Sequence, residues 1–314
     1  MTSSSCSLDS LSVLRISGPQ GVDLLHAQLT QDFRHWPDDQ ARLAALLNPQ
    51  GRMLADFIAL REDAQHSLLL LDASIAAQTL QRLRMFVLRL QCTLEDATAD
   101  WQRQGLLGSD AAAFDPRWAP PPQPWSVRRL AGGALLLRLP QADSSVRCLL
   151  LTAGADAAQM ALHRDVAALP ALTPAQWALQ DIRAGLPHIT AATQQAFVPQ
   201  MINFELIGGV SFKKGCYPGQ EVVARSQYRG TLKRRMYLVS CAAPMQPGQE
   251  VFHEADAQQP CGLVVNAAAD ASGRWWALAE IKIALAQPTG LHLQGAAGPA
   301  LELGTLPYAL SVPD

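Results

Sequence analysis

The sequence lacks the recurrent motifs of several large protein classes. It contains no G-x-G-x-x-G, no P-loop and no G-x-S-x-G, so nucleotide-binding and serine-hydrolase functions have no support. Its six cysteines include no C-x-x-C pair, which argues against a structural zinc site or a thioredoxin motif. No apolar run approaches the roughly 18 residues of a membrane span, and the polar amino terminus does not look like a secretory signal.

The composition permits a large folded protein. A chain of 314 residues is long enough for two or three domains. Hydrophobic residues make up 49% and charged residues 17%, which excludes global disorder, and the net charge of -2 excludes an overall polycation. Free thiols together with the missing export signal predict a reducing, cytoplasmic location and no membrane partner.

The residue patterns predict an α/β body followed by a β module. Short strands alternate with helices in the first part, and a proline-rich stretch at 120–124 is the best candidate linker. Thr173 and Pro174 begin a helix in the favoured cap and first positions, and this helix ends near Gly185. Beyond residue 231, short strands separated by Pro/Gly turns predict a small barrel or sandwich. The predicted strands of the body lie at 12–17, 43–47, 53–60, 68–71 and 148–152.

The most informative segment is S-F-K-K-G-C-Y-P-G-Q-E at 211–221. Two glycines and a proline around Cys216 specify a tight loop that can hold one thiol at an exposed point. The neighbouring Lys213 and Lys214 would favour the thiolate form of this cysteine. None of the seven histidines lies near Cys216 in sequence, so a Cys–His pair would have to form through the fold. Asp32 and Asp181 are candidate site carboxylates, although capping or solvated roles are the simpler interpretation.

A local basic strip follows the cysteine. Between residues 213 and 235 there are seven basic residues and one acidic residue, Glu221. A strip of this kind is either a solvated edge or an anion site, and the anion could be the polyglutamate tail of a folate or an RNA backbone. The sequence does not choose between these alternatives. The basic residues are Lys213, Lys214, Arg225, Arg229, Lys233, Arg234 and Arg235.

The segment K-G-C-Y-P-G-Q-E at 214–221 resembles the K-G-C-Y-x-G-Q-E signature of YgfZ-type folate-binding proteins, relatives of the aminomethyltransferase (T-protein) of glycine cleavage. The resemblance spans nearly the whole chain, since weaker matches occur in the family's order. They are I-S-G-P at 16–19, H-A-Q-L-T-Q-D at 26–32, L-N-P-Q-G-R at 47–52, Q-W at 176–177 with I-R-A-G-L-P at 182–187, F-V-P-Q-M-I-N at 197–203 and L-P-Y at 306–308.

This resemblance implies an α+β, T-protein-like fold of three domains, two mixed α/β domains and a carboxy-terminal small β-barrel. The implied folate-binding body combines residues 1–40 with about 110–200, and residues 41–110 form an inserted α/β domain. Residues 201–230 form the cysteine loop and linker, and residues 231–314 form the barrel.

The resemblance also implies a function. It predicts a protein that binds tetrahydrofolate or a one-carbon derivative and supports iron–sulfur cluster assembly or repair, and thereby tRNA modification. The implied partners are iron–sulfur proteins or tRNA-modifying enzymes, while direct nucleic-acid binding is left open. Two alternatives remain: a folate-dependent aminomethyltransferase, and an RNA- or protein-binding module without folate.

The implied site residues fall into two groups. Cys216 is the functional thiol, either relaying a one-carbon unit or contacting a cluster, and it should face a central folate cavity beside Trp177; no metal ligands are predicted. Thr79 stands where the T-protein has its catalytic aspartate, which leaves enzymatic activity undecided, and Leu11 replaces a second ligand-site tryptophan of some relatives. Arg183 replaces a glutamate that contacts the pterin, and it can only donate hydrogen bonds. The predicted cofactor-binding residues are Trp177, Arg183, Lys214, Tyr217, Gln220, Glu221, Arg225 and Arg229.

Overall fold

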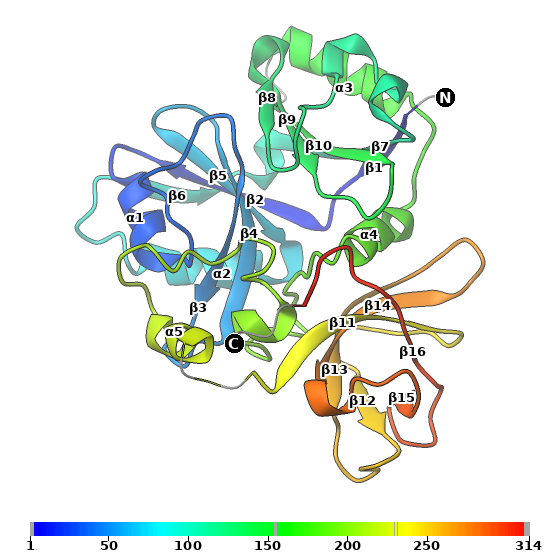
Figure 1. The fold of residues 1–314 in the computed structure, drawn as a ribbon. Coiled ribbons are helices and arrows are strands. Elements are labelled where there is room, and N and C mark those ends of the chain that lie inside the picture. The colour runs from blue at the N-terminus through cyan, green and yellow to red at the C-terminus, as the bar shows by residue number, and fades with distance from the viewer. Residues whose placement is uncertain (1–2, 154–155, 229, 231, 311–314) are drawn as a thin grey trace.

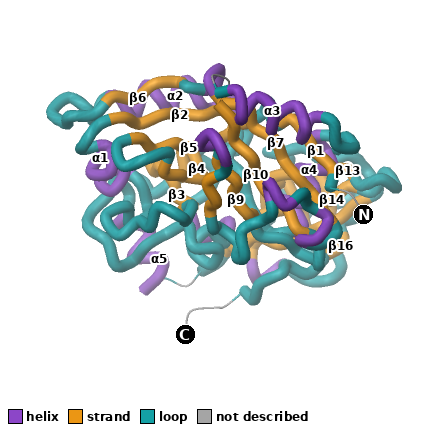
Figure 2. Tube along the Cα trace, turned by 90° about the horizontal axis from the view of Figure 1, so that it is seen from above, coloured by secondary structure: helices purple, strands orange, loops and turns teal. Residues whose placement is uncertain are grey.

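The computed structural model describes residues 3–153, 156–228, 230 and 232–310. Three antiparallel sheets organise this part of the chain, and Figure 1 shows them as three lobes around helix α4 (Pro174–Arg183). Seen from above in Figure 2, the strands form the interior and the helices lie mainly at the periphery. The predicted strands at 12–17, 43–47, 53–60, 68–71 and 148–152 are confirmed to within one or two residues at most ends.

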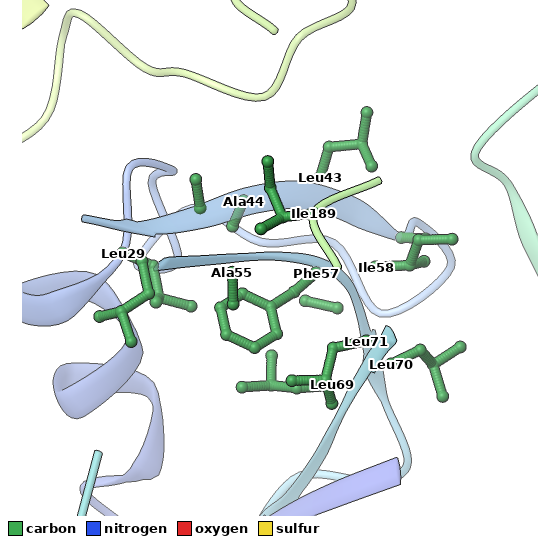
Figure 3. Close-up of a cluster of buried hydrophobic side chains, with 14 of the residues drawn as sticks. Leu29, Leu43, Ala44, Ala55, Phe57, Ile58, Leu69, Leu70, Leu71 and Ile189 are labelled. Carbon is green, nitrogen blue, oxygen red and sulfur yellow. The ribbon is translucent and has the colours of Figure 1, made fainter. Parts of the chain in front are cut away.

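The first sheet has the order β3-β4-β5-β2-β6 and contains the main hydrophobic core. Its strands are nearly continuous apolar runs, and β4 is buried along eight of its nine residues. Figure 3 shows Phe57 and Leu69 packed in this core together with Leu29. Helices α1 (Gly21–Gln28) and α2 (Ala73–Arg84) belong to this unit. The strands are β2 (Leu11–Ser17), β3 (Arg42–Leu47), β4 (Met53–Arg61), β5 (His66–Asp72) and β6 (Thr93–Asp96).

The second sheet has the order β1-β7-β10-β9-β8, with helix α3 (Ala157–Ala167) packed against β10. The third is the predicted carboxy-terminal β unit, confirmed as a six-stranded sheet of order β15-β12-β13-β14-β11-β16. The second sheet contains β1 (Ser4–Ser7), β7 (Trp101–Gly108), β8 (Val127–Arg129), β9 (Leu135–Leu139) and β10 (Val146–Ala153). The third contains β11 (Arg234–Cys241), β12 (Glu250–His253), β13 (Gly262–Ala269), β14 (Trp275–Lys282), β15 (Leu291–Leu293) and β16 (Glu302–Leu303).

Sheet membership cuts across the predicted domain ranges. Strand β2, from the segment 1–40, lies between β5 and β6, while β7, from the segment 41–110, lies between β1 and β10. The ranges themselves stay a prediction. The remaining elements are helix α5 (Gln220–Tyr228) and short 3₁₀ turns at Thr98–Asp100, Ala111–Ala113, Pro116–Trp118, Ala131–Gly133, Pro199–Ile202 and Ile283–Leu285.

Candidate functional site

A cavity of about 320 Å³ lies where the three sheets meet helix α4. Its volume falls within the roughly 300–1,000 Å³ of small-molecule sites. Apolar side chains form most of its wall, and Leu11, which replaces a tryptophan of some relatives, is among them. The lining residues include Leu8, Leu11, Ile58, Leu139, Leu149 and Trp177 on the apolar side and Asp9, Asp72, Asp181, His188, Thr190 and Asn266 on the polar side.

Helix α4 places Trp177 in this cavity. The predicted start of the helix is confirmed, because Thr173 and Gln176 form a reciprocal capping box and Pro174 occupies the first turn. Trp177 comes one turn later, is buried, and packs so closely on Gly105 that a Cβ there would lie 2.5 Å from the indole ring. The guanidinium of Arg147 lies 5.6 Å from the centre of the indole ring. The capping box and the glycine contact therefore fix the tryptophan where a planar ligand can stack on it.

A chain of four charged groups closes the polar end of the cavity. Arg147 of β10 is fully buried and its Nη1 lies 2.6 Å from Asp181 Oδ1. His188 connects this pair to the first sheet, since its Nδ1 lies 3.0 Å from Asp56 Oδ2 and its Nε2 lies 3.7 Å from Asp181 Oδ2. From the third sheet, Asn266 exchanges two hydrogen bonds with the His188 backbone. All three sheets thus converge on one histidine.

The charges in this chain compensate one another. Burial alone would lower the pKa of His188, but hydrogen bonds to Asp181 and Asp56 and their negative charges outweigh it and raise that pKa well above its usual range. Burial alone would raise the pKa of Asp181, but the positive charge of Arg147 and a hydrogen bond from His188 hold it below its usual value. Two cations therefore face two carboxylates, and Asp181 remains an ionised acceptor on the cavity wall.

The sequence did not single out this charge chain. Asp181 appeared only as a weak candidate, and nothing marked Arg147, His188 or Asp56. They come from β10, the segment after α4 and β4, so no local motif joins them. The one signal present was Asp181 four residues after Trp177, which places both on one helix face.

Two other residues lie away from the cavity wall. The guanidinium of Arg183 lies 5.5 Å from the ring centre of Trp276, and Arg183 is not a lining residue. Thr79 is buried on α2 with its hydroxyl lacking a hydrogen-bond partner, and it does not line the cavity either. The carboxylates that do reach the wall are those of Asp9, Asp72 and Asp181.

The cysteine loop packs against the β3–β4 turn and α1. Gly219 has φ +79°, and a Cβ there would lie 2.6 Å from the carbonyl oxygen of Asn48, so the loop needs glycine at this point. The ammonium of Lys214 donates to the backbone carbonyls of His26 and Leu29 and lies 4.8 Å from the ring centre of Tyr217. Lys214 thus fastens the loop to the end of α1. Burial lowers the pKa of Lys214 to about 8 and raises the pKa of Tyr217 to about 12.

Cys216 is exposed, whereas the five other cysteines are buried. Burial raises the pKa of Cys148 to about 12 and raises the pKa values of Cys6, Cys92 and Cys261. This difference in burial confirms that Cys216 is the accessible thiol of the loop. Cys216 does not line the cavity, so it does not face the region beside Trp177 as the sequence led us to expect.

His26, which is far from Cys216 in the sequence, lies beside the cysteine loop in the fold. The Nε2 atom of His26 lies 3.7 Å from the position that a Cβ on Gly215 would take. His26 accepts a hydrogen bond from the Phe33 backbone N–H at Nδ1, which leaves the proton on Nε2 in the neutral ring. Burial, together with the charges of Lys214 and Arg34, lowers the pKa of His26 despite the opposing effect of Asp32.

The other predicted residues of the motif are on α5. Gln220 and Glu221 begin this helix, and Arg225 is exposed one turn later. None of them lines the cavity, and Arg229 lies outside the described residues. Within the described ranges, no cluster of three or more histidine, cysteine, aspartate or glutamate side chains could hold a metal ion. No described helix is both long and apolar enough to cross a bilayer.

Comparison with known proteins places the chain among relatives. Residues 4–114 match the GCVT N-terminal domain. The tRNA-modifying protein YgfZ of Klebsiella pneumoniae is 32% identical over 243 residues, covering 76% of this chain and 72% of that protein. The chain belongs to the YgfZ family. The YgfZ of Edwardsiella ictaluri is 28% identical over 321 residues, covering 96% of this chain and 91% of the relative, and that of Yersinia enterocolitica is 28% identical over 309 residues, covering 97% and 92%.

The fold of this YgfZ-family chain is that of the T-protein. The glycine cleavage system aminomethyltransferase T of Bartonella henselae aligns with a TM-score of 0.77 over 98% of this chain and 86% of that structure, at 17% identity. This confirms the predicted T-protein-like α+β fold. At this identity the likeness concerns the fold alone.

Proposed function

We propose that this chain binds tetrahydrofolate or a one-carbon derivative in the cavity beside Trp177, and that it supports iron–sulfur cluster assembly or repair in the cytoplasm and thereby tRNA modification. The relatives are named tRNA-modifying proteins, and the chain has the fold of a one-carbon transfer protein. The observation that carries the proposal is the pairing, within one cavity, of a planar aromatic wall with an ionised hydrogen-bond acceptor.

The lining residues fit the chemistry of a folate. A pterin ring is planar and presents N–H groups along one edge, so it matches the indole of Trp177 and the carboxylate of Asp181. The apolar wall suits the aminobenzoyl group. No lysine or arginine is among the lining residues, so the anionic glutamate end would extend out of the cavity toward solvent. A one-carbon derivative, when bound, would supply a one-carbon unit at a defined oxidation level, whereas tetrahydrofolate itself would accept one.

Asp181 takes over the acceptor role that Arg183 cannot fill. Arginine offers donors only, and Arg183 is directed to Trp276. Asp181 lies two residues earlier on α4 and is held by Arg147 and His188, so its orientation is fixed before any ligand enters. A pre-oriented acceptor lowers the ordering cost of binding.

Calorimetry with tetrahydrofolate and its methylene and formyl derivatives tests the cofactor. We expect saturable binding of at least one form by the wild-type protein, and much weaker binding by an Asp181→Leu variant that remains folded. Equal affinity of the two proteins for every form would remove Asp181 from the site. If the wild-type protein bound no form at all, the folate proposal would be wrong.

Cellular function is tested separately. In a cell lacking the protein, the wild-type chain should restore the activity of iron–sulfur enzymes that modify tRNA, and Cys216→Ser should not. The aminomethyltransferase alternative predicts transfer from an aminomethylated lipoyl carrier, for which we expect no activity because Thr79 supplies no carboxylate. Rescue by Cys216→Ser would reduce the cysteine motif to a structural turn.

A further inference from the structure

Five exposed side chains surround the cysteine loop on one side of the molecule. They are Lys213 and Cys216 of the loop, Arg225 and Tyr228 of α5, and Arg34 from the segment after α1. We call this surface the cysteine face. Helix α5 lies at the periphery in both Figure 1 and Figure 2, away from α4 and the cavity.

Three observations place these residues near one another. The ring of Tyr228 meets Phe212, the neighbour of Lys213, edge to face with ring centres 5.9 Å apart. Arg225 precedes Tyr228 by three residues on α5, so both lie on the same side of the helix. Arg34 is close enough to Lys214 to contribute to the lowering of its pKa, after the larger effect of burial.

The positive charges of the cysteine face are not neutralised. Lys213, Arg225 and Arg34 form no side-chain ion pair with any residue that the structure describes. Glu221 is the single acidic residue between 213 and 228. The nearby Asp32 is engaged by His35, whose Nδ1 lies 3.0 Å from Asp32 Oδ2. The cysteine face therefore concentrates free cations on a chain whose net charge is -2.

The cysteine face is also separate from the cavity. The loop packs on Gly51, in the turn just before β4, whereas the β4 residue at the cavity is Ile58. Met53 and Ile58 are five residues apart on this strand, or roughly 16 Å at about 3.3 Å per residue. The part of a ligand that stacks on Trp177 therefore lies away from the cysteine loop, and Cys216 does not line the cavity, so the cysteine face is available to a different partner.

We propose that the cysteine face is an RNA-binding surface, on which Lys213, Arg225 and Arg34 contact phosphates and Tyr228 stacks on an unpaired base next to Cys216. The exposed ring of Tyr228 favours RNA over an acidic protein as the partner, because an RNA base can stack on it. Tyr228 is 70% exposed, yet its ring packs against Phe212, so an accessible aromatic ring is held on the same helix side as Arg225. Single-stranded RNA is bound by this combination of stacking rings and positive charge.

Fluorescence anisotropy with labelled, unmodified tRNA transcripts and a labelled 12-nucleotide oligouridylate tests the proposal. The tRNA probe rests on the proposed function, and the oligouridylate does not. We expect Tyr228→Ala to weaken oligouridylate binding about 5- to 100-fold, from roughly 1–3 kcal/mol of stacking, with an unchanged salt slope. Lys213→Gln with Arg225→Gln should reduce the slope of log affinity against log salt by about 1.4, since each phosphate contact contributes about 0.7.

Arg89→Gln is the matched control, because Arg89 is an exposed arginine in the loop after α2 and is not part of the cysteine face. Equal losses in Arg89→Gln and Arg225→Gln would show non-specific attraction and overturn the proposal. It would also be overturned if polyglutamate displaced RNA completely while Tyr228→Ala bound normally, because the cysteine face would then accept any acidic chain. Longer folate tails binding more tightly only when Arg225 is present would assign it to the folate tail instead.

Folate calorimetry on the same samples separates the two proposals. Folate binding without RNA binding removes the RNA-binding surface and leaves the proposed cofactor intact. RNA binding without folate binding removes the proposed cofactor and leaves the RNA-binding surface intact.

Discussion

Around the cavity, Arg147 and Asp181 lie 2.6 Å apart and are largely shielded from water, whereas around Cys216 the side chains of Lys213 and Arg225 are exposed and form no ion pair with any described residue. A buried charge without a partner costs several kcal/mol, so the cavity can hold charged groups only as a compensated network. Exposed cations pay no such cost and stay available to a partner. The cavity therefore suits a small ligand held in a fixed orientation, and the cysteine face suits a large anionic partner.

The largest expected effect breaks the buried network. Arg147→Met leaves Asp181 without its closest cation and should reduce the free energy of unfolding by about 3–5 kcal/mol, measured by urea denaturation. Arg225→Gln, at the exposed site, should change it by less than about 0.5 kcal/mol. If both variants lost the same small amount of unfolding free energy, the two regions would not differ in how they hold their charges.

The next effect concerns ligand stacking. Trp177→Ala should weaken tetrahydrofolate binding roughly 5- to 100-fold, because a stacked ring contributes about 1–3 kcal/mol. Trp177→Phe keeps a ring and should lose less. Trp276→Ala is the matched control, since Trp276 lies under Arg183 and outside the cavity wall. Unchanged affinity in a folded Trp177→Ala protein would remove Trp177 from the site.

A pH series sharpens the role of His188. Because the folded-state pKa of His188 is raised above its ordinary 6.5, the stability from its charged form is fully present below about pH 6.5. That contribution is lost as the pH rises through the raised value. The difference in unfolding free energy between the wild type and His188→Gln should therefore shrink with increasing pH. A difference that stayed constant across the series would show that the ring acts without its charge.

The smallest effect on stability belongs to the cysteine. Cys216→Ser should shift the free energy of unfolding by less than about 0.5 kcal/mol, because the side chain is exposed and the loop is shaped by Gly219. In the native protein, iodoacetamide followed by peptide mapping should modify Cys216 first and Cys148 among the last, since burial raises the pKa of Cys148 to about 12. Early modification of Cys148 would mean that β10 opens readily.

Much of the fold was predictable from local patterns. The strand at 53–60 was visible as an apolar run after a Pro/Gly turn, and the helix at Pro174 was visible from its cap. The strand order was not predictable, because β2 pairs with β5 and β6 through residues 49 to 82 positions apart, and such pairings leave no local signal.

The candidate site divides in the same way. The cysteine loop was found at once, since a contiguous segment contains its glycines, its proline and its thiol. The sequence predicts that Lys214 favours the thiolate form of Cys216. In the folded chain, the ammonium of Lys214 donates to the carbonyls at the end of α1. The direction of a long side chain depends on what packs beside it, which the segment itself does not contain.

The sequence by itself determined that this chain folds like the T-protein, that it belongs with YgfZ and that one cysteine sits on an exposed turn. These properties follow from contiguous residues and their order. Only the tertiary structure decided that Arg147, Asp181, His188 and Asp56 form one charge chain and that Cys216 lies apart from the cavity. The reason is physical: charge compensation and burial depend on distances in space, and three sheets had to pack together before those distances existed.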